Sequence, residues 1–206
     1  MRFATTHSVS PKFPDCYVTA LRNQFYPHAL TVLGDGEDHD APLKAFLPGW
    51  GCKAEWFAPW NRALLPAVVF DLDTFIVGDV TPFLKLDPTR LWMIRQFYQR
   101  PEIAKAESGI FVAPDNDALC DAIWQAAQVF DFKHGDGALM RKFPHAFIPD
   151  QIDGILSYKV HKLQDRPPPP SARVVCFHGK PAPADVASGW ARDWWQTSLN
   201  SRTKSC

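Results

Sequence analysis

Residues 67–79 have the sequence AVVFDLDTFIVGD, and the interpretation of the whole chain starts from this stretch. An apolar run of strand length, residues 67–70, ends in two carboxylates, Asp71 and Asp73, separated by one residue. Because alternate side chains of a strand point the same way, both carboxylates can face one point just past the end of the strand. Open α/β sheets bind their ligands at this edge.

Two carboxylates at this spacing suit a hard divalent cation such as Mg2+ or Mn2+, which prefers oxygen ligands. A solvated turn after the strand is the alternative, because Asp is also common in turns. The Asp-X-Asp pattern by itself leaves both interpretations open.

The composition bounds the class of protein. The chain has 206 residues, enough for one domain with a buried core, and 22 basic residues balance 22 acidic ones. This balance does not favour a nucleic-acid or anionic-membrane partner. Five scattered cysteines without a Cys-X-X-Cys pair favour a reduced compartment over a structural zinc site. With neither a signal-peptide pattern nor a membrane-length apolar run, we expect a cytoplasmic protein without a transmembrane segment.

Strand-like and helix-like patterns alternate along the chain. This order predicts an α/β domain with a parallel sheet and a nucleotide-sized crevice at the strand ends. The expected strands are residues 3–6, 29–33, 67–70, 91–94, 108–113, 147–149 and 173–177, and the expected helices lie within 14–26, 49–60, 115–130 and 138–140, with a further helix possible in 185–195. Residues 167–170 are four prolines and predict an extended loop.

Two further positions are candidates for binding a nucleotide. Asp35 lies in an acidic loop, residues 34–40, whose carboxylates could meet a ribose or base or simply solvate a turn. Lys53 is the only cation between Lys44 and Arg62, which makes it a candidate for a phosphate contact. A surface lysine is the ordinary alternative.

A second group of polar residues ends the expected strand 173–177. His178 can be a metal ligand, Gly179 allows close approach of the backbone to a phosphate, and Lys180 can neutralise that phosphate. Together with Asp71 and Asp73, His178 would supply three metal ligands. An ordinary surface His-Lys pair after a strand is the alternative.

Four motifs in this order resemble a known family. They are Asp-Leu-Asp-Thr at 71–74, Ser-Gly-Ile-Phe-Val at 108–112, Gly-Asp at 135–136 and Phe-His-Gly-Lys-Pro at 177–181. The chain resembles glycosyltransferases of the nucleotide-diphospho-sugar transferase (GT-A) fold, of the glycogenin and lipopolysaccharide galactosyltransferase type. The resemblance runs from about Phe3 to Pro181 and implies a single α/β, Rossmann-like domain with a mixed, mostly parallel central sheet flanked by helices. We expect this domain to occupy residues 1–197 and the last residues, 198–206, to form a loose tail.

The resemblance also implies roles for residues. Asp71, Asp73 and His178 match metal ligands, with Asp73 holding the cation most directly. Gly179 and Lys180 match residues that meet the donor diphosphate.

Other matches concern the donor. Lys53 matches a basic residue that helps to bind it, and Ser108 and Gly109 match a segment beside its sugar. Asp136 and Glu107 would be the acids nearest the reacting carbon. Glu107 replaces an Asn of the family and Gly137 a Gln, so contacts to the donor sugar are expected to differ.

The implied function is transfer of a sugar, with retention, from a nucleotide-diphosphate donor such as a UDP-sugar, assisted by Mn2+ or Mg2+. The acceptor would be a carbohydrate, a lipid-linked group or a protein, and no nucleic acid would be involved. Two alternatives remain. Residues 68–74 also resemble the nucleophile strand of haloacid dehalogenase-type phosphatases. Glu107 and Gly137 would be compatible with a sugar-nucleotide-binding protein of this fold that lacks turnover.

Overall fold

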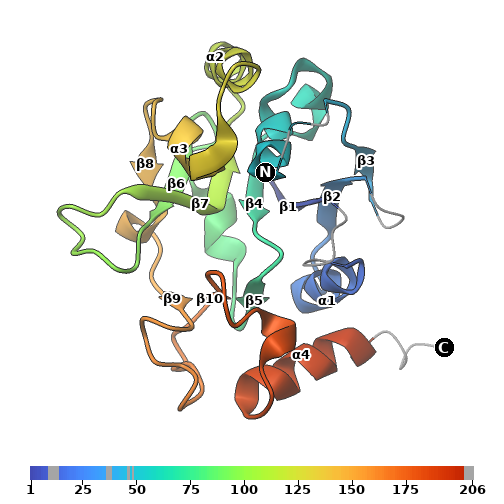
Figure 1. Ribbon diagram of the computed structural model, residues 1–206, viewed down its shortest axis with the longest axis vertical. Helices are drawn as coiled ribbons and strands as arrows, with labels where there is room; N and C mark the ends of the chain where they lie inside the picture. Colours follow the sequence, from blue (N-terminus) through green and yellow to red (C-terminus); the bar gives the residue numbers. More distant parts are fainter. Residues whose placement is uncertain (9–13, 36–38, 46, 48, 202–206) are drawn as a thin grey trace.

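The computed structural model describes residues 1–8, 14–35, 39–45, 47 and 49–201. Within these residues seven strands form the main sheet, in the order β3-β2-β1-β4-β7-β6-β8 (Figure 1). Their bounds are β1 (Arg2–His7), β2 (Leu30–Gly34), β3 (Ala41–Pro42), β4 (Ala67–Phe70), β6 (Trp92–Arg95), β7 (Ala106–Ala113) and β8 (Ala146–Phe147). Strand β7 runs antiparallel to β4 and β6, and the other neighbours are parallel. The expected mixed, mostly parallel sheet is confirmed.

A smaller sheet is built from β5 (Thr74–Ile76), β10 (Val174–Cys176) and β9 (Ile155–Ser157). Strand β10 lies in the middle, antiparallel to β5 and parallel to β9. In Figure 1 this sheet lies between the main sheet and α4. Since β5 follows β4 after a turn of three residues, the two sheets are joined at Asp71 and Asp73.

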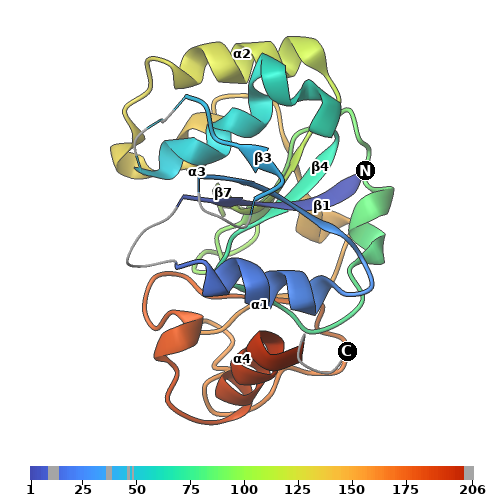
Figure 2. The ribbon, with the colours of Figure 1, turned by 90° about the vertical axis from the view of Figure 1, so that its right-hand side faces the viewer.

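Helices cover both faces of the main sheet. The α-helices are α1 (Cys16–Phe25), α2 (Asp117–Ala127), α3 (Asp136–Met140) and α4 (Trp190–Asn200), and the 3-10 helices are η1 (Gly49–Phe57), η2 (Pro59–Leu64), η3 (Thr81–Lys85), η4 (Phe132–His134), η5 (Ile148–Asp150) and η6 (Pro183–Asp185). Figure 2 shows α2 above the sheet and α1 below it, with α4 beyond α1. Alternate residues of β4 therefore enter two different cores.

The core below the sheet is rich in aromatic rings. Phe70, the last residue of β4, is fully buried there, with its ring centroid 5.1 Å from that of Phe25, 5.5 Å from Phe83 and 6.1 Å from Phe3. Val68 lies in the same core, whereas Val69 faces the core under η1 and α2. The residue that precedes Asp71 is thus held by packing on several sides.

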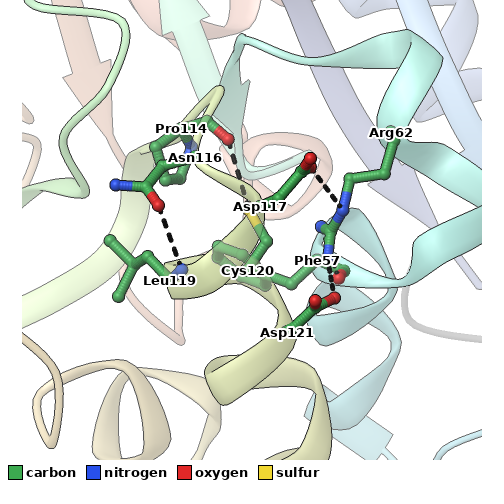
Figure 3. Close-up of polar contacts among 8 residues, drawn as sticks. All are labelled: Phe57, Arg62, Pro114, Asn116, Asp117, Leu119, Cys120 and Asp121. Carbon is green, nitrogen blue, oxygen red and sulfur yellow. Dashed lines mark hydrogen bonds and ion pairs between the residues drawn. The ribbon is translucent and has the colours of Figure 1, made fainter.

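The start of α2 is tied to η2 by polar contacts (Figure 3). The side chain of Asn116 caps the helix by accepting a hydrogen bond from the backbone N–H of Leu119 at 3.1 Å. Arg62 donates to Asp121 at 2.5 Å and pairs with Asp117 at 3.2 Å. Its guanidinium also donates to the carbonyl of Phe57 at 2.7 Å, so one side chain links η1, η2 and α2.

Most of the expected elements are present. The structure adds β3, β5 and β9, which were not expected, because strands of two or three residues carry too short a pattern to detect. The run expected as a strand at 147–149 contributes only the end of β8 and then turns into η5, and the aromatic stretch 49–60 forms 3-10 helices. Helix α4 continues past residue 197 to Asn200, so the structured part is longer than expected, while residues 202–206 lie outside the described residues.

The directions of the strands bring several distant chain segments to one edge of the main sheet, the edge at which its parallel strands end. The carboxyl ends of β1, β2, β4 and β6 and the amino end of antiparallel β7 all lie along this edge of the sheet. Among the described residues, none of the helices combines the length and apolar character that a membrane crossing requires. Within the same part of the chain, Cys16, Cys52, Cys120 and Cys176 are free thiols.

We expect Phe70→Ala to lower the free energy of unfolding by about 3 to 5 kcal/mol, because it leaves a cavity among three rings. Ile103→Ala is the control, since Ile103 is 70% exposed and its truncation should have little effect. Urea unfolding of both variants measures the difference, and equal losses would contradict the assigned core.

Candidate functional site

A cavity of about 570 Å³ opens at the edge where the strand ends meet. Its lining comes from chain segments that are far apart in sequence: the ends of β1, β4, β6 and β10, the start of β7, and the segments that carry η1 and α3. The lining residues used below are Thr6, Ser8, Lys53, Asp71, Asp73, Gln96, Phe97, Tyr98, Glu107, Ser108, Gly109, Asp136, Gly137, His178 and Gly179. This volume is in the range of small-molecule sites.

Asp71 and Asp73 line the cavity from a turn and not from a strand. Strand β4 ends at Phe70, and Asp71 is the first residue after it, with its N–H donating to the carbonyl of Gly109 at 2.9 Å. The alternation argument applied to the sequence was therefore wrong in its geometry, because β5 begins only at Thr74. Both carboxylates nevertheless reach the same cavity.

Lys53 lies buried between two carboxylates. Its ammonium forms an ion pair with Asp71, lies 3.3 Å from Asp136 Oδ2 and donates to the carbonyl of Ser108 at 3.4 Å. Burial opposes its charge, but the carboxylates of Asp136 and Asp71 outweigh burial and hold the pKa of Lys53 well above its usual value. With 8% of its surface exposed, Lys53 is not the surface lysine of the alternative interpretation.

His178 is brought to the carboxylates by the small sheet. Cys176 pairs with Thr74, and the N–H of Phe177 donates to the carbonyl of Asp73 at 2.9 Å. Burial first, and the charge of Lys159 second, lower the pKa of His178 from 6.5 to about 4. The imidazole is therefore neutral at pH 7, and within the described part of the chain its buried Nε2 has no hydrogen-bond partner.

The side chains of Asp71, Asp73 and His178 are of the chemical types that bind a hard divalent cation. Two carboxylates and a neutral imidazole are ligands that Mn2+ or Mg2+ accepts, and Asp71, Asp73 and His178 line one cavity. Across the described residues, no three His, Cys, Asp or Glu side chains are already gathered at metal-binding spacing. Metal binding at these residues would therefore include a rearrangement of side chains.

The acids near Ser108 are held in place by neighbouring side chains. Asp136 begins α3 and is buried against Lys53, whereas the Glu107 side chain is 38% exposed in the cavity. Gln96 donates a hydrogen bond to Glu107, and Arg141 Nη1 lies 3.9 Å from the same carboxylate oxygen. These contacts hold the Glu107 carboxylate in the wall of the cavity.

Glycines shape the same region. A Cβ at Gly137 would lie 3.3 Å from Ser108 Oγ, and one at Gly109 would lie 3.8 Å from Asp71 Oδ2. The contact at Gly137 would be tight and the one at Gly109 an ordinary van der Waals contact, so glycine lets these two backbone segments pack against Ser108 and Asp71. A side chain at Gly137 would crowd Ser108, and one at Gly109 would crowd Ile94, whose Cδ1 would lie 3.3 Å from the added Cβ.

The structure separates the members of the His-Gly-Lys motif. His178 and Gly179 line the cavity, but Lys180 is exposed and is not among the lining residues. Lys159, from the loop after β9, donates to the carbonyl of His178 instead and lies 3.9 Å from where a Cβ of Gly179 would be. Gly179 itself has a φ of +69°, which favours glycine.

Asp35 lies at the margin of the site. It is exposed, and its carboxylate accepts a hydrogen bond from Ser8 Oγ at 3.1 Å, while Ser8 and not Asp35 lines the cavity. Residues 36–38 of the acidic loop lie outside the described residues. Asp35 can therefore act on a ligand only at the outer end of β1 and β2.

Sequence reasoning missed several lining or neighbouring residues. Thr6, Ser8, Gln96, Phe97, Tyr98 and Lys159 carry no motif of their own. Their common signal is position, because all except Lys159 follow or end an expected strand. Lys159 gives no such signal, since its strand β9 was not expected.

Comparison with solved structures identifies the fold. GlyE, a glycosyltransferase of Streptococcus pneumoniae TIGR4, is similar over 98% of this chain and 63% of its own, with 12% identity and a TM-score of 0.62. The galactosyltransferase LgtC, solved with donor and acceptor sugar analogs, is similar over 98% of this chain and 96% of its own, with 10% identity and a TM-score of 0.57. The chain has a glycosyltransferase fold.

A third structure with this glycosyltransferase fold is an enzyme involved in glycosylation of the major capsid of PBCV-1. It is 10% identical, with coverage of 96% of this chain and 99% of its own and a TM-score of 0.53. No family model and no curated protein sequence matches the chain. Since the chain spans 63% of the length of GlyE and the identities are low, the likeness shows the fold, and activity is treated below as a proposal.

We expect Lys53→Met to lower the free energy of unfolding by about 3 to 5 kcal/mol, because Asp71 and Asp136 would lose their shared counter-charge. Adding Asp136→Asn should recover part of this loss. Lys133→Met is the control, since Lys133 pairs with Asp131 at the exposed surface. Denaturant unfolding provides the measurement, and a Lys53→Met protein as stable as the control would contradict the buried ion pair.

The pKa of His178 predicts how stability depends on pH. Because the pKa is about 4 in the folded chain and near 6.5 when unfolded, the unfolded chain binds a proton first as pH falls. As the pH falls from 6.5 to 4, the free energy of unfolding should therefore decrease by about 1.4 kcal/mol per pH unit. Above pH 6.5 His178 should cause no such loss.

The substitution His178→Gln removes the pH-dependent contribution of His178 and leaves every other ionisable group in place. The free energy of unfolding of the variant, measured in EDTA from pH 7 to pH 4.5, should therefore fall less steeply than that of the unaltered protein. Parallel curves for the two proteins would show that His178 is not buried as a neutral imidazole.

Proposed function

We propose that this chain transfers a sugar from a nucleotide-diphosphate donor, most simply a UDP-sugar, to an acceptor hydroxyl, with Mn2+ or Mg2+ and with retention. One observation carries the proposal: Asp71, Asp73 and His178 line one cavity at the edge of a glycosyltransferase fold. The fold supports the use of a nucleotide-sugar donor, as in the LgtC structure that contains a donor analog. The cytoplasmic location expected from the cysteines stays a prediction.

The residues of the chain have separable tasks in this proposal. When bound by Asp71, Asp73 and His178, a divalent cation supplies positive charge that stabilises the departing diphosphate. Lys53 pairs with both Asp71 and Asp136 and so holds these two carboxylates side by side at the wall of the cavity. A metal at Asp71 would compete with the ammonium of Lys53 for the same carboxylate, which couples metal binding to the position of Lys53.

The diphosphate would contact the end of β10. Gly179 has no side chain to obstruct a phosphate, and its backbone is exposed at the cavity. We assign the nearby positive charge to Lys159 in place of Lys180, because Lys159 already contacts the carbonyl of His178. A fixed ammonium beside the leaving group stabilises negative charge where it develops.

Ser108, Gly109, Asp136 and Glu107 would surround the donor sugar. Asp136 is held by Lys53 and Glu107 by Gln96, so both acids have a defined direction before any ligand binds. Water must be excluded from this region, because it would otherwise replace the acceptor.

The two alternatives predict different chemistry. A binding protein without turnover would bind the donor and the metal but would not hydrolyse the donor slowly in the absence of an acceptor. A phosphatase would hydrolyse a generic phosphate monoester rapidly and show no metal-dependent binding of UDP.

We expect UDP with Mn2+ to raise the melting temperature by about 5 to 10 °C at a hundredfold excess over the Kd, because ligand binding stabilises the folded state by about 2.7 kcal/mol under that condition. Asp73→Asn should lose the metal-dependent part of the shift. Asp165→Asn, an exposed acid outside the cavity, is the matched control and should keep it.

The same thermal-shift assay tests the proposal as a whole. It is run with UDP-, GDP-, CDP- and ADP-sugars, each with and without Mn2+. If none of them stabilises the protein in the presence of the metal, the proposal is wrong. Slow hydrolysis of a stabilising donor, abolished by Asp73→Ala, would exclude the binding protein without turnover.

A further inference from the structure

The cavity has two ends that are set by the order of the strands. Thr6 and Ser8 line it at the end of β1, whereas Phe97 and Tyr98 line it at the end of β6. In the sheet, β4 and β7 separate β1 from β6, so the two ends are about 14 Å apart. Asp71 lies between them, at the end of β4.

The β6 end is formed by aromatic rings, which we call the aromatic wall (Phe97 and Tyr98). Tyr98 is 65% exposed, although it is a large and partly apolar side chain. The ring of His178 packs on this wall, with its centroid 4.8 Å from Phe97 and 6.0 Å from Tyr98. Single exposed rings are common on open protein surfaces and do not indicate a function. A ring that is exposed inside a cavity, as Tyr98 is, can contact a ligand bound there.

Polar groups lie directly beside the aromatic wall. Gln96 precedes Phe97 in the chain, and its amide donates to Glu107 across the β6–β7 pair. Arg141 lies 3.9 Å from the same carboxylate and donates to the carbonyl of Ala106 at 2.7 Å. The wall thus combines an apolar face with a rigid edge of amide and carboxylate groups.

This combination matches one ligand chemistry. A pyranose ring presents an apolar face of C–H groups, which carry partial positive charge and pack on the negative face of an aromatic ring. Its hydroxyls lie around the rim, where an amide and a carboxylate can bind them. A peptide or an alkyl chain offers no such ring of hydroxyls around a flat apolar face.

The position of the aromatic wall indicates that the sugar bound there is the acceptor and not the donor sugar. If the donor diphosphate lies at Asp71, Asp73 and His178, its nucleoside extends toward Thr6 and Ser8, and the β6 end remains for the second substrate. We propose that the aromatic wall, with Gln96 and Glu107, binds a pyranoside acceptor by stacking on Tyr98. This inference rests on the proposed function and makes the acceptor a carbohydrate.

The experiment uses methyl β-D-glucopyranoside and methyl β-D-galactopyranoside as probes, with cyclohexanol and a serine-containing tripeptide as comparison compounds. Saturation-transfer NMR measures their binding to the whole chain in the presence of UDP and diamagnetic Mg2+. At least one glycoside should receive saturation at its ring C–H groups, and the comparison compounds should receive little.

Variants separate stacking from general effects on the fold. Tyr98→Ala should weaken binding of the glycoside about 3- to 10-fold, and Tyr98→Phe should restore it because the ring is kept. Trp60→Ala is the matched control, since Trp60 is 41% exposed and does not line the cavity. The melting temperature of each variant without ligand shows whether it is folded.

The outcomes distinguish this inference from the proposed function. The inference is overturned if UDP with Mg2+ or Mn2+ stabilises the protein but neither glycoside binds. It is also overturned if the Tyr98→Ala variant binds the glycoside as well as the unaltered chain does. Stronger saturation of the tripeptide or cyclohexanol would also overturn it. If UDP fails to bind while a glycoside binds through Tyr98, the proposed donor site is wrong and the sugar site stands.

Discussion

The buried ion pair of Lys53 with Asp71 and Asp136 is the interaction on which the rest of the site depends. It joins η1, the turn after β4 and the start of α3, three segments that are distant in the sequence. A single buried charge without a partner would be expensive, so the three residues specify one another's positions. Trp56, on the same helix as Lys53, donates to Thr6 and ties η1 to β1 as well. The walls of the cavity are therefore set by charge as much as by apolar packing.

The second constraint is the short turn that joins the two sheets. Because β5 begins at Thr74 and pairs with β10, the end of β10 must lie beside Asp73. His178 is placed next to the carboxylates by backbone pairing, before any ligand takes part. The main sheet contributes carboxylates and the small sheet contributes an imidazole and Gly179, so the cavity belongs to neither sheet alone. Among the described residues, Asp71, Asp73 and His178 line this cavity without being gathered at metal-binding spacing.

Much of the fold could be predicted because its signals are local. The apolar run that becomes β4 and the capped, amphipathic pattern of α2 are each contained within a dozen residues, and both elements lie close to where they were expected. Strands β5 and β9 were not predictable in this way, since three residues carry no usable period and form strands only because β10 pairs with them. For a related reason the sequence could not show that Lys180 does not line the cavity. Sequence spacing shows that a lysine follows His178, but the path of the backbone after Gly179 decides whether that lysine faces the cavity.

The sequence by itself determined that two carboxylates follow a buried strand, that a histidine follows another, and that both belong to an α/β domain. These properties follow from periodicity and composition, which act over neighbouring residues. Only the tertiary structure decided that Lys53 is buried between Asp71 and Asp136, that Lys159 and not Lys180 lies at His178, and that Tyr98 lines the cavity. Such contacts join residues that are far apart in the chain. Their partners are chosen by packing and by the cost of burying charge, neither of which is visible in the order of residues.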